Sequence, residues 1–349
     1  MGTVSQATLT RLLEYFWHPV CTRRELAAAA PHPLAVRLLN RALVVADLSD
    51  AVLVAADRCP HRSTRLSVGW IEDASVQCAY HGWRYASDGT CVEIPSTPDG
   101  PLPSQRCLDV VEAAFAYDLV WVRLDSSLPT TIPANPACDD PSMHVVAGAP
   151  YTWPTSSLRR VENFVDLAHF AWVHDGSLGR RDHPVPPVPD IVREDGELRF
   201  RYLPLALPET SPEAMIGTSD YRMPMPCTVD IAFDIEGMPG VRRHLWMTAS
   251  PVDSGICRCF WFTSRNDDRD GDDGPHLEFQ QLILDEDAPV VCNQDPPELS
   301  LDPGFEISLR TDRVSIEYRR WLAELAEAAS APDRVTEVLV GRSEAPRRA

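Results

Sequence analysis

The spacing of apolar and polar positions changes along the chain. Between residues 42 and 124 the apolar runs are short, β-branched and separated by turn residues, as in ALVVADL, AVLVAAD, SVQCAY and DLVWVRL. This spacing predicts a small all-β module. Ahead of it we expect helices over 8–16 and 23–30, with an extended piece over 17–21 between them. Pro31 and Pro33 stop the second helix.

The second half of the chain predicts a mixture of helices and strands. Residues 125–150 are rich in Pro, Ser and Asp, which indicates a domain boundary with a linker over 131–150. A single helix is expected over 158–174, followed by a Pro-rich loop. The remaining expected elements are strands over 197–205, 228–235, 241–249 and 255–264, an acidic loop over 266–274, and helices over 276–284 and 312–328.

These elements divide the 349 residues into about two domains. The first, residues 1–130, holds the N-terminal helices and the β module. The second, residues 151–335, combines strands with helices, so the fold class is α+β. Residues 336–349 are expected to be disordered, as chain ends often are.

Composition narrows the classes of partner. The chain carries 32 Lys and Arg against 51 Asp and Glu, a net charge of −19, which opposes binding to nucleic acid and to an anionic membrane surface. No apolar run reaches the roughly 18 residues of a membrane span, and the first residues lack the pattern of a secretory signal. We therefore expect a cytoplasmic protein, in which ten cysteines indicate metal or redox chemistry rather than disulfides.

Two Cys-His pairs lie in the β module. Cys59-Pro-His61 and, after sixteen intervening residues, Cys78-Ala-Tyr-His81 each offer one thiolate and one imidazole. Two thiolates on one iron and two imidazoles on the other are the ligands of a Rieske [2Fe–2S] centre. Structural zinc usually pairs Cys with Cys and His with His, and a chance pairing of buried Cys with His is the remaining alternative. The pattern favours the cluster.

A second polar group lies in the expected helix over 158–174. At about 100° per residue, Asn163, Asp166, His169 and His174 span an arc of about 140°. Two histidines and a carboxylate that leave coordination positions open are the ligand set of non-haem Fe(II) oxygenases. The alternative is a capped helix with two satisfied core histidines. Because the i, i+5 spacing of the histidines is not ideal for one metal, we expect the helix to distort or to end near Val173.

These two motifs resemble one known family. The segment CPHRSTRLSVGWIEDASVQCAYHGW resembles the Rieske module of the Rieske non-haem iron oxygenases, with Ser63 where the family usually has Gly, and N-x-x-D-x-x-H-x-x-x-x-H resembles their catalytic helix. The resemblance covers residues 15–325 and implies a catalytic domain of antiparallel sheet and helices, of the helix-grip or START-like type. It also implies that His169 and His174 ligate a mononuclear Fe(II), that Asp166 bridges subunits, and that Asn163 lies near the iron.

The third iron ligand comes from elsewhere in the chain. In the demethylase-like branch of the family the ligand is the Asp of an E-D-x-x-V-V stretch, and residues 286–291, EDAPVV, match it. The resemblance therefore favours Asp287, with Asp285 as the alternative. The other interpretation of the run Asp285-Glu286-Asp287 is a solvated acidic face.

The resemblance implies partners as well. An external reductase or ferredoxin, supplied by NAD(P)H, reduces the cluster, and the electron passes from His81 through Asp166 to His169 of the adjacent subunit. O₂ is the co-substrate. Heterologous interfaces that close form rings, so we expect a head-to-tail homotrimer.

The chain resembles the single-component monooxygenases of this family, so we expect hydroxylation or O- or N-demethylation of a hydrophobic aromatic or polycyclic small molecule. Oxidative cyclisation, desaturation and ring dioxygenation are alternatives on the same iron. An alternative of another class is a Rieske electron carrier whose second domain only binds a ligand. The expected walls of the substrate pocket are apolar and Met-rich, which suits a hydrophobic ligand. The candidate substrate contacts are Arg243, His244, Trp246, Met247, Phe260 and Phe279.

Overall fold

The computed structural model describes residues 4–49, 51–105, 107–203, 216–329, 334, 335 and 338. Contacts divide the chain into two compact units. One comprises residues 14–132, and the other comprises residues 133–349 together with residues 1–13. Within the described residues no helix combines the length and the apolar character that a membrane span requires.

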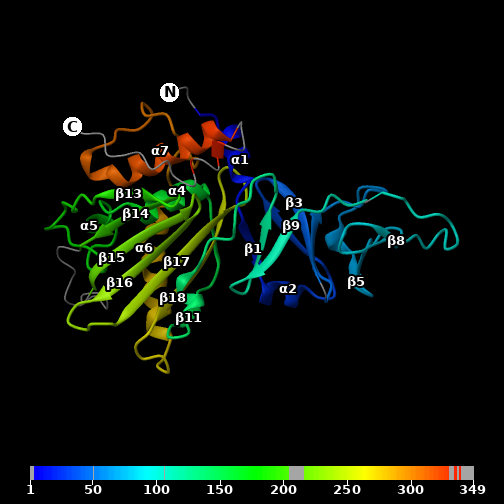
Figure 1. Cartoon of the computed structure of the whole chain (residues 1–349), viewed down its shortest axis with the longest axis horizontal. Coiled ribbons are helices and arrows are strands. Elements are labelled where there is room, and N and C mark those ends of the chain that lie inside the picture. The colour runs from blue at the N-terminus through cyan, green and yellow to red at the C-terminus, as the bar shows by residue number, and fades with distance from the viewer. Residues whose placement is uncertain are drawn as a thin grey trace. The chain divides into compact units, whose positions relative to one another are not determined.

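The unit of residues 14–132 is built from small antiparallel sheets (Figure 1). α2 (Arg23–Ala29) opens with a capping box in which the Thr22 hydroxyl and the Glu25 carboxylate each accept a backbone N–H. The sheets have the orders β1-β10-β9, β2-β3-β4 and β5-β6-β7-β8. Their strands are β1 (His18–Thr22), β2 (Leu34–Leu38), β3 (Arg41–Asp47), β4 (Val52–Ala56), β5 (Trp70–Glu72), β6 (Ser75–Gln77), β7 (Arg84–Tyr85), β8 (Cys91–Glu93), β9 (Glu112–Ala116) and β10 (Leu119–Arg123).

The core of this unit lies directly beneath the Cys-His loops. Cys59 and Cys78 belong to a buried cluster that also contains Leu53, Val76 and Tyr85. Both thiols are 2% exposed. The apolar runs that predicted strands therefore also form the floor of the candidate cluster site.

A long antiparallel sheet forms the other unit, and among the described residues it has eight strands (Figure 1). Its order is β11-β18-β17-β16-β15-β14-β13, with β12 also paired to β18. The strands are β11 (His144–Ala147), β12 (Tyr151–Trp153), β13 (Ile191–Glu194), β14 (Glu197–Tyr202), β15 (Ile216–Met225), β16 (Thr228–Ile235), β17 (Arg242–Pro251) and β18 (Cys257–Arg265).

Helices cover this sheet. α4 (Ser157–Val165) packs against β16, β17 and β18 and also contacts α6 (Gly274–Val291), which in turn contacts α5 (Phe170–Val173). α7 (Arg313–Ala328) packs on α4 and on α1 (Gln6–Leu13). A sheet with a long helix laid along it is the architecture that the family resemblance implied.

Several expected boundaries differ from the structure. Residues 131–150 are not a simple linker, because they contain α3 (Pro136–Asp139) and β11, which pairs with β18 from His144 to Ala147. The sequence did not predict this short strand, because the Pro and Asp residues around it are typical of a linker. β13 and β15 were not expected, and α6 is longer than the helix expected over 276–284. α1 groups with the C-terminal unit, although it was assigned to the first domain. The predicted tail over 336–349 lies, except for residue 338, outside the described residues.

Candidate metal centres

Two loops of the N-terminal unit share one backbone arrangement. The N–H of Cys59 donates to the Thr64 carbonyl at 2.8 Å, and the N–H of Ser63 donates back to the Cys59 carbonyl at 2.9 Å. In the second loop the N–H of Cys78 donates to Trp83 at 2.8 Å, and that of Gly82 donates to Cys78 at 3.0 Å. Each loop therefore folds back on its cysteine through the same pair of hydrogen bonds.

The side chains of these loops converge. The His61 and His81 rings are 4.5 Å apart, edge to face, and His61 stacks on Trp83 at 4.6 Å. Burial raises the pKa of the Cys78 thiol, although backbone N–H groups in its own loop partly oppose this. His61 Nδ1 is buried and finds no hydrogen-bond partner among the described residues. Two buried thiols and two imidazoles, one with an unsatisfied ring nitrogen, fit the donor set of a [2Fe–2S] Rieske cluster.

In the C-terminal unit the expected single helix over 158–174 is broken. α4 begins with the Ser156 hydroxyl accepting the N–H of Arg159 at 3.2 Å. It ends at Val165, because Asp166 is extended (ψ 127°) and its carboxylate accepts the N–H of Ala168 at 2.8 Å. An Asp that captures the N–H two residues on offers the backbone an alternative to the helix. The helix was expected to distort or end near Val173, but the break at Asp166 lies seven residues earlier. The break removes the poor i, i+5 alignment of the two histidines.

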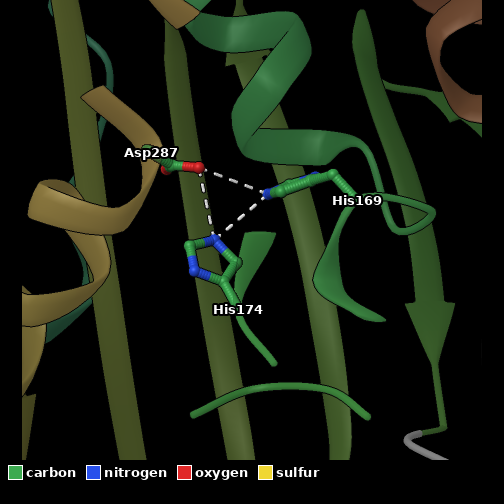
Figure 2. A group of neighbouring side chains, drawn as sticks. All are labelled: His169, His174 and Asp287. Atoms are coloured by element: carbon green, nitrogen blue, oxygen red, sulfur yellow. Dashed lines mark hydrogen bonds and ion pairs between the residues drawn. The ribbon is translucent and has the colours of Figure 1, made fainter. Parts of the chain in front are cut away.

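The break brings His169 and His174 to one carboxylate of α6 (Figure 2). The two Nε2 atoms are 3.2 Å apart, and Asp287 Oδ1 lies 3.4 Å from His169 Nε2 and 3.2 Å from His174 Nε2. One donor atom from each of the three residues falls within 4.8 Å of the others. Two imidazoles and one carboxylate that meet in this way fit a mononuclear Fe(II) with open positions. Asp285 is exposed and binds Gln281 at 2.8 Å.

The electrostatics of this triad favour a cation. Burial lowers the pKa of His169, but the Asp166 and Asp287 carboxylates outweigh it and raise that pKa to about 9. Burial opposes ionisation of Asp287, yet the two histidines and Arg160 hold its pKa well below the usual range. The site therefore holds an ionised carboxylate in a buried position.

Arg160 and Asn163 surround Asp287 on the side of α4. The Arg160 side chain is 1% exposed, contacts the Asn163 carbonyl oxygen, and lies 3.7 Å from Asp287 Oδ2. Because its carbonyl faces Arg160, the Asn163 amide group donates to Asp287 Oδ1 at 3.2 Å. Asn163, which the family resemblance placed near the iron, therefore lies beside the triad. Arg160 was missed, and a buried arginine has no sequence signal of its own.

Asp166 lies at the edge of the triad. Its Oδ2 is 3.5 Å from His169 Nδ1, and its side chain is 32% exposed. A groove beside it is lined by Val173, Val290, Ile307 and Arg319, among others. Asp166 thus lies between the partly buried His169 and solvent.

An apolar cavity opens over the triad between α6 and the sheet. His169, His174 and Asp287 form part of its wall. The other lining residues are mainly aromatic and aliphatic: Tyr151, Phe164, Phe170, Leu178, Tyr202, Ser219, Tyr221, Ile231, Phe233, Leu245, Met247, Trp261, Phe279, Gln280, Ile283 and Leu284, with Arg160 and Asn163. Of the candidate substrate contacts, Met247 and Phe279 are on this wall.

The other four candidates are not on it. Leu245 and Met247 face the cavity, so His244 and Trp246 point to the opposite face of β17. There His244 lies 3.5 Å from Asp230, and the Trp246 indole donates to a backbone carbonyl at 3.2 Å. Arg243 pairs with Asp267 at 3.0 Å. Phe260 is excluded by the same alternation, since its neighbour Trp261 lines the cavity.

Comparisons with known proteins agree with the fold of both units. A Rieske [2Fe-2S] domain model matches residues 16–111, and a vanillate O-demethylase oxygenase C-terminal domain model matches residues 153–328. The fold and the sites together define an iron-dependent oxygenase with two metal centres. The chain belongs to the Rieske non-haem iron oxygenases.

Relatives extend this likeness over nearly the whole chain. Methylxanthine N1-demethylase NdmA of Pseudomonas putida is 39% identical over 90% of each chain, and methylxanthine N3-demethylase NdmB of the same species is 40% identical over 91% of this chain and 90% of its own. The structure of NdmA with caffeine has a TM-score of 0.89 at 36% identity, covering 98% of this chain and 99% of that one. Dicamba monooxygenase, at 20% identity and a TM-score of 0.74, shares the fold.

Membership fixes the class of reaction. The protein is an oxidoreductase, a monooxygenase that uses a Rieske [2Fe–2S] cluster, a mononuclear iron, O₂ and electrons from a reductase to oxidise a small organic molecule.

Proposed function

We propose that this oxygenase removes N-methyl groups from a flat, methylated heteroaromatic compound of the methylxanthine type. The observation that carries the proposal is an apolar, aromatic-lined cavity directly over the His169, His174 and Asp287 triad, in a chain whose relatives over 90% of its length are methylxanthine N-demethylases.

The cavity wall suits such a ligand. Aromatic rings such as Tyr221 and Trp261 offer flat apolar surfaces, while Gln280 and Ser219 place an amide and a hydroxyl on the same wall. Ligand sites usually combine an apolar lining with a few polar groups that fix orientation. We assign Gln280 and Ser219 to the ring nitrogens and carbonyl oxygens of the substrate, and the aromatic residues to its faces.

We assign the metals to the residues that converge in each unit. Cys59, His61, Cys78 and His81 hold the cluster, and His169, His174 and Asp287 hold the mononuclear iron. The bound iron supplies oxidation of the substrate N-methyl group by O₂. The chain holds the methyl group over the triad and excludes water with apolar side chains, while Asn163 and Arg160 keep the Asp287 carboxylate oriented.

The overall change balances with two electrons from the reductase. The group N–CH₃, O₂, two electrons and two protons give N–CH₂OH and H₂O, and N–CH₂OH then separates into N–H and formaldehyde. Formaldehyde is therefore released once per demethylation. Ring dioxygenation, cyclisation and desaturation release none, which separates them from demethylation in one assay.

We also propose that electrons enter through the neighbouring subunit of a cytoplasmic head-to-tail homotrimer. His81 is exposed in one unit, and Asp166 is one-third exposed beside His169 in the other. In a ring of subunits Asp166 accepts a hydrogen bond from His81 of one neighbour while it contacts its own His169. The reductase or ferredoxin that supplies the cluster is then an obligatory partner.

The test is turnover of the iron-loaded full chain with NADH and a Rieske reductase. Caffeine, theobromine and the singly methylated xanthines form one set of substrates, and aryl methyl ethers such as vanillate form the other. We expect substrate-dependent O₂ uptake, formaldehyde release and a demethylated product with at least one methylxanthine.

Three other outcomes have distinct meanings. Turnover of aryl methyl ethers alone would overturn the N-demethylase proposal in favour of O-demethylation, which the vanillate O-demethylase domain model makes the second candidate. Turnover without formaldehyde would overturn demethylation in favour of ring dioxygenation, cyclisation or desaturation. A protein that binds about two irons per chain instead of about three, and consumes no O₂, would be an electron carrier, because the cluster alone holds two.

A further inference from the structure

Three consecutive acidic residues of α6 have three different environments. Asp285 faces solvent and binds Gln281, while Asp287 faces the histidine pair. Glu286, between them, has no part in the function proposed above. Its Oε2 lies 2.7 Å from His174 Nδ1 and 2.7 Å from the Ser177 hydroxyl.

These contacts fix which ring nitrogen of His174 is free for a metal. His174 Nε2 points to Asp287 Oδ1 at 3.2 Å, and Nδ1 points to Glu286. A carboxylate accepts only, so the hydrogen of the neutral ring resides on Nδ1 and the lone pair on Nε2. Carboxylates that hold a ligating histidine in this way set its tautomer and orientation and raise its basicity.

A tight backbone turn after His174 positions the Ser177 hydroxyl against Glu286. The His174 carbonyl accepts the N–H groups of Ser177, Leu178 and Gly179, each at 3.0 Å. Gly179 packs so closely that a Cβ there would lie 2.3 Å from the Phe170 carbonyl oxygen. This turn brings the Ser177 hydroxyl, which is buried, to the same Glu286 oxygen that accepts from His174.

The other histidine of the triad lacks such an internal anchor. His169 Nδ1 is 3.5 Å from Asp166 and makes no hydrogen bond within the described residues. His174 is 1% exposed and His169 13%. One imidazole is therefore tied to its own subunit, and the other faces the carboxylate that we assign to the subunit interface.

We propose that Glu286, supported by Ser177, is the positioning residue that fixes the ring and tautomer of His174 and so keeps the iron site formed independently of the subunit interface. This inference rests on the proposed assignment of the mononuclear iron to His169, His174 and Asp287. Glu286 acts through His174 and does not line the substrate cavity.

A graded series of variants of the full chain tests the proposal. Each variant is loaded with ferrous iron, and the iron retained against a competing chelator is measured together with the EPR spectrum of the nitric oxide adduct. Glu286→Ala is expected to lower iron affinity by about 10- to 100-fold and to change the EPR line shape. Glu286→Gln keeps an acceptor oxygen without the charge and loses less, and Ser177→Ala loses less again. Asp285→Asn, the matched control on the same helix, retains wild-type affinity.

Each outcome of this series supports or overturns the role of Glu286. Wild-type affinity and line shape in both Glu286 variants would overturn the inference. If Glu286→Ala does not fold, the nearly isosteric Glu286→Gln decides alone, with the cluster absorbance as the measure of intact protein. His174→Ala distinguishes a wrong iron ligand set from a wrong role for Glu286. If it keeps the mononuclear iron, the proposed ligand set fails. If His174→Ala loses the iron while the Glu286 variants keep wild-type iron affinity and EPR line shape, only the role of Glu286 fails.

Discussion

The two candidate metal centres are built in contrasting ways. In the N-terminal unit every donor lies between Cys59 and His81, on two loops with the same pair of backbone hydrogen bonds. In the C-terminal unit the two histidines flank the short helix α5, just after the break that ends α4, and the carboxylate comes from α6, more than a hundred residues later. The cluster site is one local loop arrangement that occurs twice, whereas the mononuclear site forms only when α4, α5 and α6 are packed together on the sheet.

This contrast has a consequence for how each centre fails. A local centre depends on its own ligands and the small core beneath them. An assembled centre depends also on residues that never touch the metal, such as Arg160, Glu286 and the Asp166 turn. We therefore expect the two centres to be lost independently.

The largest effect is expected from Cys59→Ser. Loss of one of the two thiolates removes the cluster, because a serine hydroxyl does not replace a thiolate on iron in this donor set. The visible absorbance and the EPR signal of the reduced Rieske cluster should disappear, while mononuclear iron bound to the catalytic unit remains measurable by metal analysis. A surviving cluster spectrum would contradict the ligand assignment.

Asp287→Ala should give the reciprocal result. Removal of the carboxylate leaves two histidines and a buried Arg160 without its Asp287 partner, so the mononuclear iron is lost and turnover stops, but the cluster spectrum is unchanged. Asp285→Ala is the control, since that side chain is on the surface of the same helix. If Asp285→Ala loses the iron instead, the third ligand has been misassigned.

Asp166→Asn is expected to preserve both centres and still slow turnover by about 10- to 100-fold. The amide is similar in shape but cannot serve as a charged acceptor for both His169 and the neighbouring His81. Metal analysis and cluster absorbance should match wild type. The decisive measurement is the rate at which a reduced cluster is reoxidised in the presence of substrate and O₂, and an unchanged rate would remove Asp166 from the electron path.

The same contrast explains what could be predicted from the sequence. The cluster loops were recognised because their donors have fixed spacing, and the strands beneath them because β-branched runs alternate with turns. His169, His174 and Asp287 were brought together only through the family motif. The sequence predicted one helix as far as about Val173, since periodicity does not register an Asp166 carboxylate that captures a backbone N–H.

The substrate wall was the least predictable part. Two of six candidates line the cavity, Met247 and Phe279. A strand shows which residues share a face but not which face is covered by α6, so His244 and Trp246 were placed on the wrong side. Tyr202, Tyr221 and Gln280 meet only in the folded unit, and no local pattern relates them.

A smaller effect is expected at Tyr85, whose hydroxyl lies 3.2 Å from Cys59 Sγ. A hydrogen bond to a cluster sulfur stabilises the reduced, more negative state, so Tyr85→Phe should lower the reduction potential of the cluster. One hydrogen bond worth about 1.4 kcal/mol corresponds to roughly 60 mV for a one-electron couple. Tyr80→Phe, at an exposed site, is the control. Equal potentials in wild type and Tyr85→Phe would show that the hydroxyl does not donate to the sulfur.

The smallest effect tests whether the two cluster loops are equivalent. Ser63 and Gly82 occupy corresponding positions, with φ of 58° and 72°. A left-handed backbone costs a non-glycine residue about 1–2 kcal/mol, and glycine gives back about 0.4–1 kcal/mol through the unfolded chain. Ser63→Gly should therefore raise the free energy of unfolding by about 0.5 kcal/mol, measured by denaturant unfolding followed through cluster absorbance.

The reciprocal change Gly82→Ser should cost more than Ser63→Gly gains. A Cβ at Gly82 would lie 3.0 Å from the Pro95 ring and 3.6 Å from the Gln77 amide nitrogen, so a side chain there meets packed neighbours as well as backbone strain. Ser63, by contrast, is exposed. Changes of equal size and opposite sign would mean that only the shared backbone turn matters. A larger loss at Gly82 would mean that the two loops share a turn but differ in how tightly the rest of the unit packs around them.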